Sequence, residues 1–187
     1  VNAPLLDEAR DERGARVEQA ELEREHATFH SATHVFCVSR AVAAYVARQN
    51  VPGERIHVTP NGVDVDVFRP DLPRALELAL PRDAFVLGFH GRLRPWHNLA
   101  LLGEVVARLA ARGYPVHVLA IGEGDFAAHF EPELRASRLT VLPWMAPQRL
   151  ASHVARFDAL PLCYGAGREC YFSPLKLLEA MACGVVP

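Results

Sequence analysis

Two charged side chains interrupt an apolar stretch near the end of the chain. Lys176 and Glu179 are three residues apart, so both lie on one face of a helix, and every other residue of 175–182 is leucine, alanine or methionine. Lys176 falls in the predicted first helical turn, where the helix dipole disfavours a cation. A bound anion reverses this penalty, because free backbone N–H groups at a helix start favour one. The spacing therefore leaves two interpretations open, an ion pair and an anion-binding site.

The helix that carries these two residues has a recognisable start. Ser173 is a favourable N-cap residue and Pro174 suits the first helical position. The apolar residues spread around the whole circumference, which predicts a buried helix. The segment is therefore predicted to be a loop that leads into a buried helix, with the charged pair at its rim.

A second set of candidate residues follows the predicted strand 85–89. In the run 90–97, which reads His-Gly-Arg-Leu-Arg-Pro-Trp-His, Gly91 allows a ligand to approach the backbone closely. Arg92 and Arg94 are suited to phosphate oxygens, because a guanidinium binds them in a bidentate way. The alternative is that both arginines are solvated surface side chains at a strand end.

Both sets of candidate residues belong to a predicted series of alternating strands and helices. Continuous apolar strands separated by helices predict a Rossmann-like α/β fold, a parallel sheet flanked by helices. In such sheets ligands bind outside the carboxyl ends of the strands, where both charged sets fall. Strands are expected at 85–89, 116–121, 139–143 and 159–163, and helices at 99–112, 126–136 and 148–156. The helix at 99–112 is expected to bury Leu101, Leu102, Val105, Val106 and Leu109.

The first third of the chain holds a shorter series. A charged, alanine-rich stretch predicts an exposed helix, and Ser39 is expected to cap a second one. Asn61 and Gly62 predict a turn, because both tolerate positive φ, and the Pro- and Asp-containing stretch that follows predicts a connection between domains. The expected elements are a helix at 7–30, strands at 34–39 and 56–59, a turn at 60–64 and the connection at 67–81.

The composition is that of an ordinary globular protein. Half of the 187 residues are apolar and the formal net charge is −2, so no basic excess suggests a nucleic-acid partner. The 4 cysteines and 9 histidines show no metal-ligand spacing, and scattered cysteines fit a reduced, cytoplasmic setting. No apolar run approaches the roughly 18 residues of a membrane span, and no secretory signal is visible. The missing initiator methionine and the abrupt end at Pro187 suggest a fragment.

The sequence resembles a known family of enzymes. Residues 173–176 (Ser-Pro-Leu-Lys) and 179–184 (Glu-Ala-Met-Ala-Cys-Gly) resemble the nucleotide-sugar signature of the family-four glycosyltransferases of the group 1 type. The Gly-Arg-Leu run from Gly91 and the Asn-Gly-Val-Asp stretch from Asn61 match the same family, so the resemblance covers nearly the whole chain.

This resemblance implies an incomplete GT-B fold with two domains. Residues 1–66 would be the end of the first, acceptor-side domain with the hinge. Residues 67–187 would be most of the nucleotide-sugar donor-binding domain, truncated at its C-terminus.

The resemblance also implies roles for individual residues. Arg92 and Lys176 would bind the donor diphosphate, together with backbone N–H groups near Ser173 and Leu175. His97 stands where the family usually has a diphosphate-binding lysine, and a neutral histidine binds phosphate less strongly. In the same comparison, Glu179 would accept hydrogen bonds from the ribose hydroxyls.

The remaining implied positions concern the transferred sugar and the cleft. The other signature glutamate of the family falls on Tyr171 here. Glu169, two residues upstream, is the candidate that could replace it, and the catalytic group is otherwise unassigned. The expected cleft-lining residues are Gly91, Gly122, Gly124 and Trp144. The two glycines of the Gly-Glu-Gly run would shape the cleft floor, and Trp144 either lines the base pocket or plugs a strand end.

The implied function is a retaining glycosyltransferase of the hexosyltransferase type. It would transfer a sugar from a nucleotide-diphosphate sugar to a glycan, a lipid or a small molecule. No cofactor or metal is expected, because Arg92, Lys176 and the helix N-terminus would stabilise the leaving diphosphate. No nucleic-acid partner and no transmembrane segment are expected, while peripheral membrane association of the full-length protein is left open. The fragment alone is expected to be inactive.

Two alternatives stay open at this point. Tyr171 and His97, which depart from the family pattern, keep alive a non-catalytic GT-B module that binds a nucleotide sugar. A GT-B sugar epimerase is the other alternative.

Overall fold

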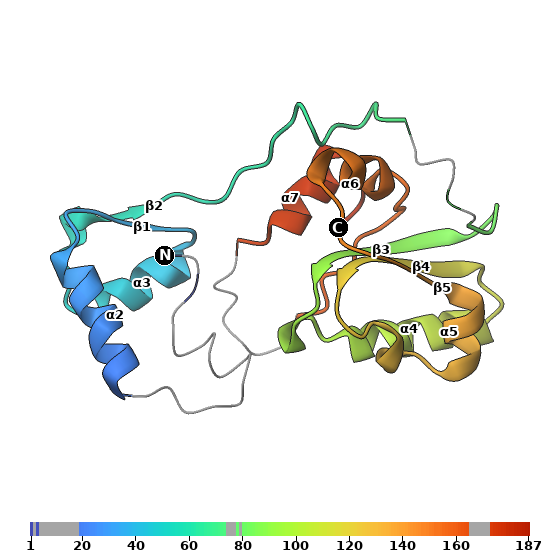
Figure 1. The fold of residues 1–187 in the computed structure, drawn as a ribbon, viewed down its shortest axis with the longest axis horizontal. Coiled ribbons are helices and arrows are strands. Elements are labelled where there is room, and N and C mark those ends of the chain that lie inside the picture. The colour runs from blue at the N-terminus through green and yellow to red at the C-terminus, as the bar shows by residue number, and fades with distance from the viewer. Residues whose placement is uncertain (2, 4–18, 74–77, 79, 165–172) are drawn as a thin grey trace. The chain divides into compact units, whose positions relative to one another are not determined.

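The computed structural model describes residues 1, 3, 19–73, 78, 80–164 and 173–187. The chain divides into two compact units, Val1–Gly62 with Ala166–Pro174, and Val63–Gly165 with Leu175–Pro187. Figure 1 shows both units with their helices and strands labelled. They are described separately below.

The first unit is built on two short parallel strands. Val35 and Cys37 of β1 are buried while Phe36 between them is exposed, so the side chains of β1 alternate between the two faces of the pair. Phe29 of α2 and Val42 of α3 belong to the same buried cluster as the inward strand residues. The elements are α2 (Gln19–Ser31), β1 (Val35–Cys37), α3 (Arg40–Ala47), a 3-10 turn η1 (Gly53–Arg55) and β2 (Ile56–Val58).

Local side-chain bonds fix the ends of these elements. The hydroxyl oxygen of Ser39 accepts the backbone N–H of Val42 at 3.2 Å, so the predicted N-cap of α3 is confirmed. Arg55 donates to the carbonyl oxygens of His30 and Ala32 at the end of α2, where helical carbonyls have no partner within the helix.

The predicted turn at 60–64 is wrong. Neither Asn61 nor Gly62 has a positive φ. The backbone N–H of Asn61 donates to the hydroxyl oxygen of Ser173 at 3.2 Å, and its side-chain amide donates to the Ser173 carbonyl at 2.7 Å. Long-range bonds therefore satisfy Asn61, where the sequence suggested a local turn.

The second unit contains a parallel sheet. Its strands pair in the order β3-β4-β5, and Ala159 extends the sheet through single parallel bridges to Leu87 and to Val186. The predicted strand at 159–163 is thus reduced to one bridge residue. The predicted parallel α/β architecture itself is confirmed. The strands are β3 (Phe85–Arg92), β4 (Val116–Glu123) and β5 (Leu139–Leu142).

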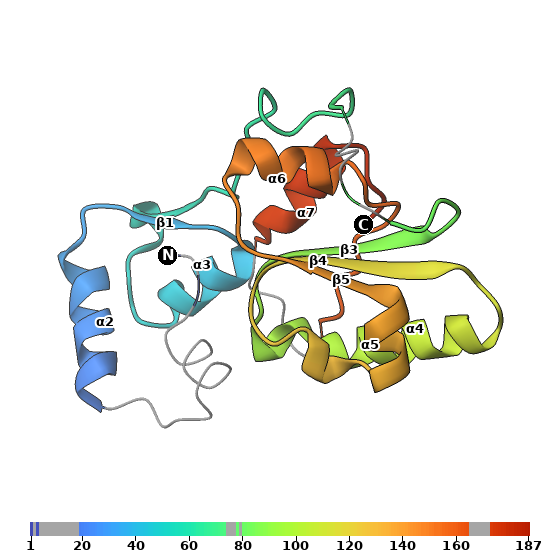
Figure 2. The same cartoon turned by 45° about the vertical axis from the view of Figure 1, so that its right-hand side comes forward.

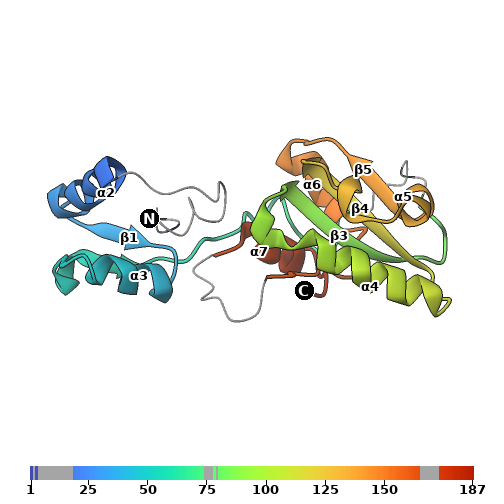
Figure 3. The same ribbon diagram turned by 90° about the horizontal axis from the view of Figure 1, so that it is seen from below.

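Helices cover both faces of this sheet. Figures 1 and 2 show α4 and α5 on one side and α6 and α7 on the other, and Figure 3 shows α4 running along the sheet. Val86 packs in one cluster with α6 and α7, and Leu87 packs in the other with α4, as the two-residue period of a strand requires. The helical elements are η2 (Pro95–His97), α4 (Leu99–Ala111), η3 (Ala127–His129), α5 (Pro132–Arg138), α6 (Pro147–Val154) and α7 (Leu175–Ala182).

Several predicted helical details need correction. The helix expected at 126–136 is a 3-10 turn followed by α5, which begins at Pro132. Proline lacks the N–H that a continuous helix would need there, so the helix restarts at this residue. On α4, Leu101 and Val105 are exposed, while Leu102 and Val106 are buried as predicted.

Helix α7 is half-buried, which corrects the prediction of a buried helix. Ala180 is its only buried residue, while Leu175 and Met181 are 51% and 56% exposed. The helix begins at Leu175, and the hydroxyl oxygen of Ser173 accepts the backbone N–H of Asn61. Among the described helices, none is both long and apolar enough to span a membrane.

Candidate functional site

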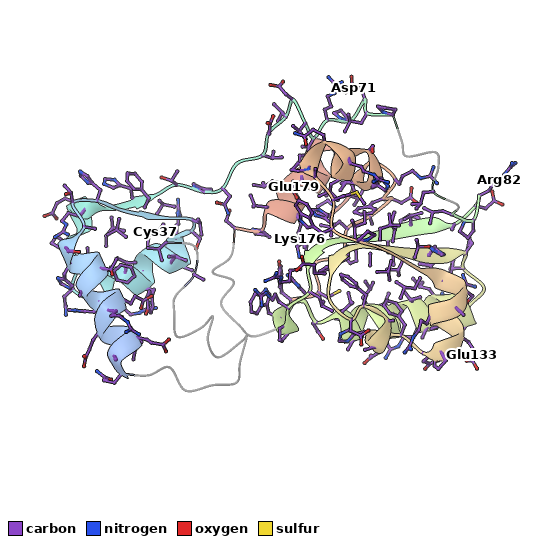
Figure 4. The ribbon with its side chains drawn as sticks, viewed as in Figure 1. Cys37, Asp71, Arg82, Glu133, Lys176 and Glu179 are labelled. Carbon is purple, nitrogen blue, oxygen red and sulfur yellow. The ribbon has the colours of Figure 1, made fainter. Side chains whose placement is uncertain are left out.

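Lys176 reaches from the first turn of α7 to the loop that follows β3. Its amine Nζ lies 2.9 Å from Nε2 of His97 and 4.3 Å from the centre of the Phe89 ring. Phe89 lies in the second half of β3, and His97 ends the turn η2 that follows this strand, near the edge where parallel sheets bind ligands. Figure 4 labels Lys176 and Glu179 on this helix.

His97 is fixed in place by its own loop. Its Nδ1 accepts the backbone N–H of Arg94 at 3.0 Å, and its ring packs edge-on against Phe89 with centroids 5.1 Å apart. Burial lowers the pKa of His97 to about 3, and the nearby Lys176 and Arg94 cations add to this effect. His97 is therefore a neutral imidazole at any ordinary pH.

The ammonium of Lys176 is in a poor environment for a charge. Burial lowers the pKa of Lys176 to about 8, although the carboxylate of Glu179 acts in the opposite direction. The aromatic face of Phe89 offers some stabilisation to a cation. This side chain therefore changes charge much closer to neutral pH than an ordinary lysine.

Glu179 faces a buried histidine on the strand beneath it. Nδ1 of His90 lies 3.5 Å from Oε2 of Glu179, and the His90 side chain is only 4% exposed. Burial first, and the Lys176 cation second, lower the pKa of His90 to about 4, so its ring is neutral. Burial raises the pKa of Glu179, partly offset by Lys176.

The two charged residues of α7 do not form an ion pair with each other. Lys176 contacts His97 and Glu179 faces His90. The ion pair that the spacing of Lys176 and Glu179 suggested is therefore not formed in this structure. In addition, Nε2 of His90 is buried and has no hydrogen-bond partner in the part of the chain that the structure describes. Buried polar atoms are normally satisfied, so this edge of the sheet has unmet hydrogen-bonding capacity.

Arg92 is the last residue of β3. Its Nη2 and Nε lie 2.7 Å and 2.9 Å from Oε2 of Glu123, the residue opposite it in the sheet register. Its side chain is 63% exposed. Arg92 is thus accessible and carries a carboxylate partner at the strand end.

Glycines bring the two strand ends close together. Gly91 and Gly122 face each other in the register and have φ of 108° and 138°. A Cβ at Gly122 would lie 2.2 Å from the Gly91 carbonyl oxygen, so only glycine fits there. Gly124 also has a positive φ, of 133°. Trp144, in contrast, is 66% exposed beyond β5.

Two further predicted residues, Ser173 and Leu175, lie on either side of Pro174, just before and at the start of α7. Ser173 belongs to the first unit and Leu175 begins α7 in the second. Glu169 and Tyr171 fall outside the described residues. Over the ranges that are described, no group of three or more His, Cys, Asp or Glu side chains could hold a metal ion.

The sequence analysis assigned no role to two residues of this site, His90 and Phe89. Strand periodicity offered a signal for His90, because it lies two residues after Gly88 and four after Val86 and must share their face, against α6 and α7. Phe89 offered none, because its contact with Lys176 depends on how far that side chain reaches.

Comparison with solved structures defines the class of fold. Sucrose-phosphate synthase from Thermosynechococcus elongatus matches with a TM-score of 0.68 at 22% identity, over 92% of this chain and 44% of that one. Anabaena HepE, solved with UDP and glucose, matches with a TM-score of 0.63 at 19% identity, over 90% of this chain and 47% of that one. The chain therefore has the fold of the GT-B glycosyltransferases.

Sequence comparison adds the family. A family model described as Glycosyltransferase Family 4 matches residues 8–67, and one described as Glycosyl transferases group 1 matches residues 84–187. The second match covers more than half of the chain, which therefore belongs to the group 1 glycosyl transferases, as the motifs suggested.

Curated relatives are considerably longer than this chain. A D-inositol 3-phosphate glycosyltransferase of Mycolicibacterium paratuberculosis is 35% identical over 141 residues, which is 70% of this chain and 30% of the relative. One of Stackebrandtia nassauensis is 47% identical over 60 residues, 31% of this chain and 14% of the relative. The chain thus spans about a third or less of the length of these two relatives.

Proposed function

We propose that this protein is a retaining glycosyltransferase and that its second unit binds the nucleotide-diphosphate sugar donor. The observation that carries the proposal is the position of Lys176 and Glu179. They lie one turn apart on α7 and face the carboxyl end of β3, with a buried, unsatisfied His90 nitrogen beside them. A cation and a carboxylate at this spacing suit the diphosphate and the ribose of one nucleotide.

The diphosphate is bound from three directions. Lys176 supplies a cation on one side, and the exposed Arg92 supplies a planar pair of donors on the other. Backbone N–H groups in the first turn of α7, near Leu175, supply the third set, where the helix dipole also favours an anion. Without a ligand, the helix dipole disfavours the positive charge of Lys176 in the first turn. A bound anion makes that charge favourable.

Glu179 binds the ribose. Its carboxylate accepts hydrogen bonds from adjacent hydroxyl groups, and His90 restricts the orientation of that carboxylate from below. The raised pKa of Glu179 is lowered again when hydroxyl donors reach it, because hydrogen bonds to a carboxylate favour its charged form.

Catalysis in this proposal is stabilisation of the leaving group. The bond between the sugar carbon and the diphosphate oxygen breaks, and negative charge grows on the diphosphate. Lys176, Arg92 and the α7 N-terminus supply positive charge and hydrogen-bond donors to the leaving diphosphate, which stabilises the transition state. The acceptor hydroxyl oxygen then attacks from the face that the diphosphate leaves and passes its proton to the leaving diphosphate oxygen. Attack from that face retains the configuration, and no metal ion is needed to neutralise the diphosphate.

The comparisons support a nucleotide sugar as donor. Anabaena HepE was solved with UDP and with UDP-glucose, and a starch synthase of Arabidopsis thaliana with ADP and acarbose. The acceptor is a hydroxyl group on a glycan, a lipid or a small molecule.

Nucleotide binding by the full-length protein tests the site. Calorimetric titration with UDP, ADP and GDP identifies the base, and Lys176→Met, Arg92→Ala and Glu179→Ala should each weaken the preferred nucleotide about 10- to 100-fold. Glu104→Ala on α4, which removes an exposed partner of Arg108, is the matched control and should leave affinity unchanged. Unchanged affinity in both Arg92→Ala and Glu179→Ala would overturn the site assignment.

Product analysis tests the reaction. NMR of the anomeric proton after incubation with the matching sugar nucleotide and an acceptor should show a new glycosidic bond with the donor's configuration. An inverted product would overturn the retaining mechanism. A released epimer, or binding without any turnover, would instead support the epimerase or the non-catalytic module.

A further inference from the structure

The hydrogen bonds around His97 determine which of its nitrogens carries the proton. Nδ1 accepts the backbone N–H of Arg94 at 3.0 Å, and an accepting nitrogen in a neutral imidazole has no hydrogen of its own. The ring proton must then be on Nε2, which lies 2.9 Å from Nζ of Lys176. An ammonium group has only donors and cannot accept that hydrogen. A neutral amine can accept it, through its lone pair.

We propose that Lys176 and His97 form a proton-coupled pair: in the free site the neutral Lys176 amine accepts the Nε2–H of His97, and binding of the donor diphosphate adds a proton to Nζ. This inference rests on the donor-binding function proposed above. The proton comes from solvent buffer and forms one new N–H bond on Nζ, while His97 keeps its own proton. The resulting ammonium and the Nε2–H both become donors to phosphate oxygens.

The choice of residue type supports this exchange. Lys176 is the only lysine in the chain, and every other basic side chain of the Lys and Arg type is arginine. Arginine stays charged at any accessible pH, whereas a buried lysine readily gives up its proton. Among the lysine and arginine side chains, the one able to lose its charge is thus the one largely buried beside a histidine.

Charged and titratable groups surround the pair on every element packed against it. Glu179 on α7 favours the charged lysine, while Arg94 in the η2 loop opposes a further positive charge on His97. The neutral His90 on β3 and Tyr164, whose ring centroid lies 6.3 Å from that of His97, complete the described surroundings. The effect of burial outweighs that of Glu179 and leaves the pKa of Lys176 at about 8, so the neutral amine is present in about half of the free sites at pH 8.

The pairing also accounts for a histidine at the position where the family usually has lysine. Two lysines in an empty site would place two buried cations side by side, which is costly. A neutral lysine and a neutral histidine form a hydrogen bond with each other in the free site, and no buried charge is left unpaired before the anion binds.

Calorimetry in buffers of different ionisation enthalpy measures the proton taken up. UDP is the probe, because its terminal phosphate is fully ionised above about pH 7; ADP or GDP replaces it if that nucleotide binds better. Wild type should take up almost no proton at pH 6.5, about half a proton at pH 8 and nearly one at pH 9.5, as a group with a pKa of about 8 requires. The dissociation constant should rise about tenfold per pH unit above pH 8.5.

Three variants separate the pair from other groups. The arginine of Lys176→Arg keeps the positive charge but cannot deprotonate. This variant should therefore bind UDP without proton uptake, and its dissociation constant should not rise at high pH. His97→Phe removes the Nε2–H donor that stabilises the neutral amine of Lys176. The midpoint of proton uptake should therefore shift upward by about half to one pH unit. His117→Phe, at the amino end of β4 where His117 pairs with Thr140, is the matched control and should behave as wild type.

A direct titration of the amine gives a second readout. Competitive acetylation, quantified on the peptide that contains Lys176, should show a midpoint near pH 8 in the free protein and above about pH 10.5 with saturating UDP. Nucleotide binding without proton uptake at pH 9, or uptake that persists in Lys176→Arg, would overturn the pair and leave the proposed function standing. Failure of all three nucleotides to bind at any pH would overturn both.

Discussion

The Arg92 guanidinium is held by Glu123, directly opposite it in the register of β3 and β4, with two of its nitrogens within 2.9 Å of one carboxylate oxygen. Both side chains are more than half exposed, so this ion pair itself adds little to stability. The ion pair matters instead for ligand binding by Arg92. A carboxylate at the strand end competes with any phosphate for the same donors.

Removing the Glu123 charge should strengthen donor binding. Glu123→Gln frees Arg92 and removes a negative charge beside the diphosphate, so the affinity for UDP should rise about two- to fivefold, the value of an exposed ion pair. Titrations at low and high salt check the cause, because the gain should shrink as salt screens the charges. Glu104→Gln on α4 is the control. A weaker complex in Glu123→Gln would mean that Glu123 positions Arg92 for the ligand.

Glu179 and His90 should together determine how the ribose is recognised. Wild type should bind UDP about 10- to 100-fold more tightly than its 2′,3′-dideoxy analogue, because a charged acceptor would lose its hydroxyl partners. Glu179→Gln should remove most of that difference. His90→Gln should remove part of it, because the carboxylate is then free to turn away.

Inorganic pyrophosphate supplies the control for this comparison. It has no ribose, so its affinity should be the same in wild type and in His90→Gln. Equal losses for UDP and for pyrophosphate would show that His90 supports the fold of the whole site and has no specific effect on the ribose contact.

The sequence predicted the sheet and the charged set of this site for physical reasons. Continuous apolar strands such as Val116–Glu123 identify a parallel sheet, and Lys176 and Glu179 stand out against an apolar helix. The partners of these residues were not predictable in this way. His97 and His90 lie 79 and 89 residues away from Lys176 and Glu179 in the sequence, and only the packing of α7 on β3 brings them together.

The errors have a similar origin. Leu101 and Val105 fit an apolar helical stripe, yet the face of α4 that meets the sheet is centred on Leu102 and Val106. Periodicity predicts that a helix has a buried face, but the neighbouring strands determine where that face is centred.

Acid should destabilise the protein through its buried histidines. His90 has a folded-state pKa of about 4 against an ordinary value near 6.5, so the unfolded state binds more protons between these values. Stability is therefore complete above about pH 6.5 and is lost as the pH falls toward 4, by about 3 kcal/mol for this residue. Urea unfolding at several pH values should show a shallower acid loss in His90→Gln. An identical pH dependence in wild type and variant would contradict the buried, neutral state of His90.

Gly88 should be intolerant of any side chain. A Cβ there would lie 2.0–2.3 Å from ring atoms of Phe157, and the Phe157 ring also stacks near His90, with centroids 6.3 Å apart. Gly88→Ala should therefore lower the free energy of unfolding by about 1–3 kcal/mol, the usual cost of overpacking a core. It should also lower the affinity for UDP, because it displaces His90. Gly53→Ala, where a Cβ meets nothing within 4 Å, should change stability by less than about 0.5 kcal/mol.

A second-site change identifies the cause of this destabilisation. Phe157→Leu shortens the ring that the new methyl group would strike, so the double variant should be less destabilised than the sum of the two single variants. Chemical denaturation of the four proteins gives the coupling energy. Additive losses would place the cost of Gly88→Ala in the backbone of β3 and not in its contact with Phe157.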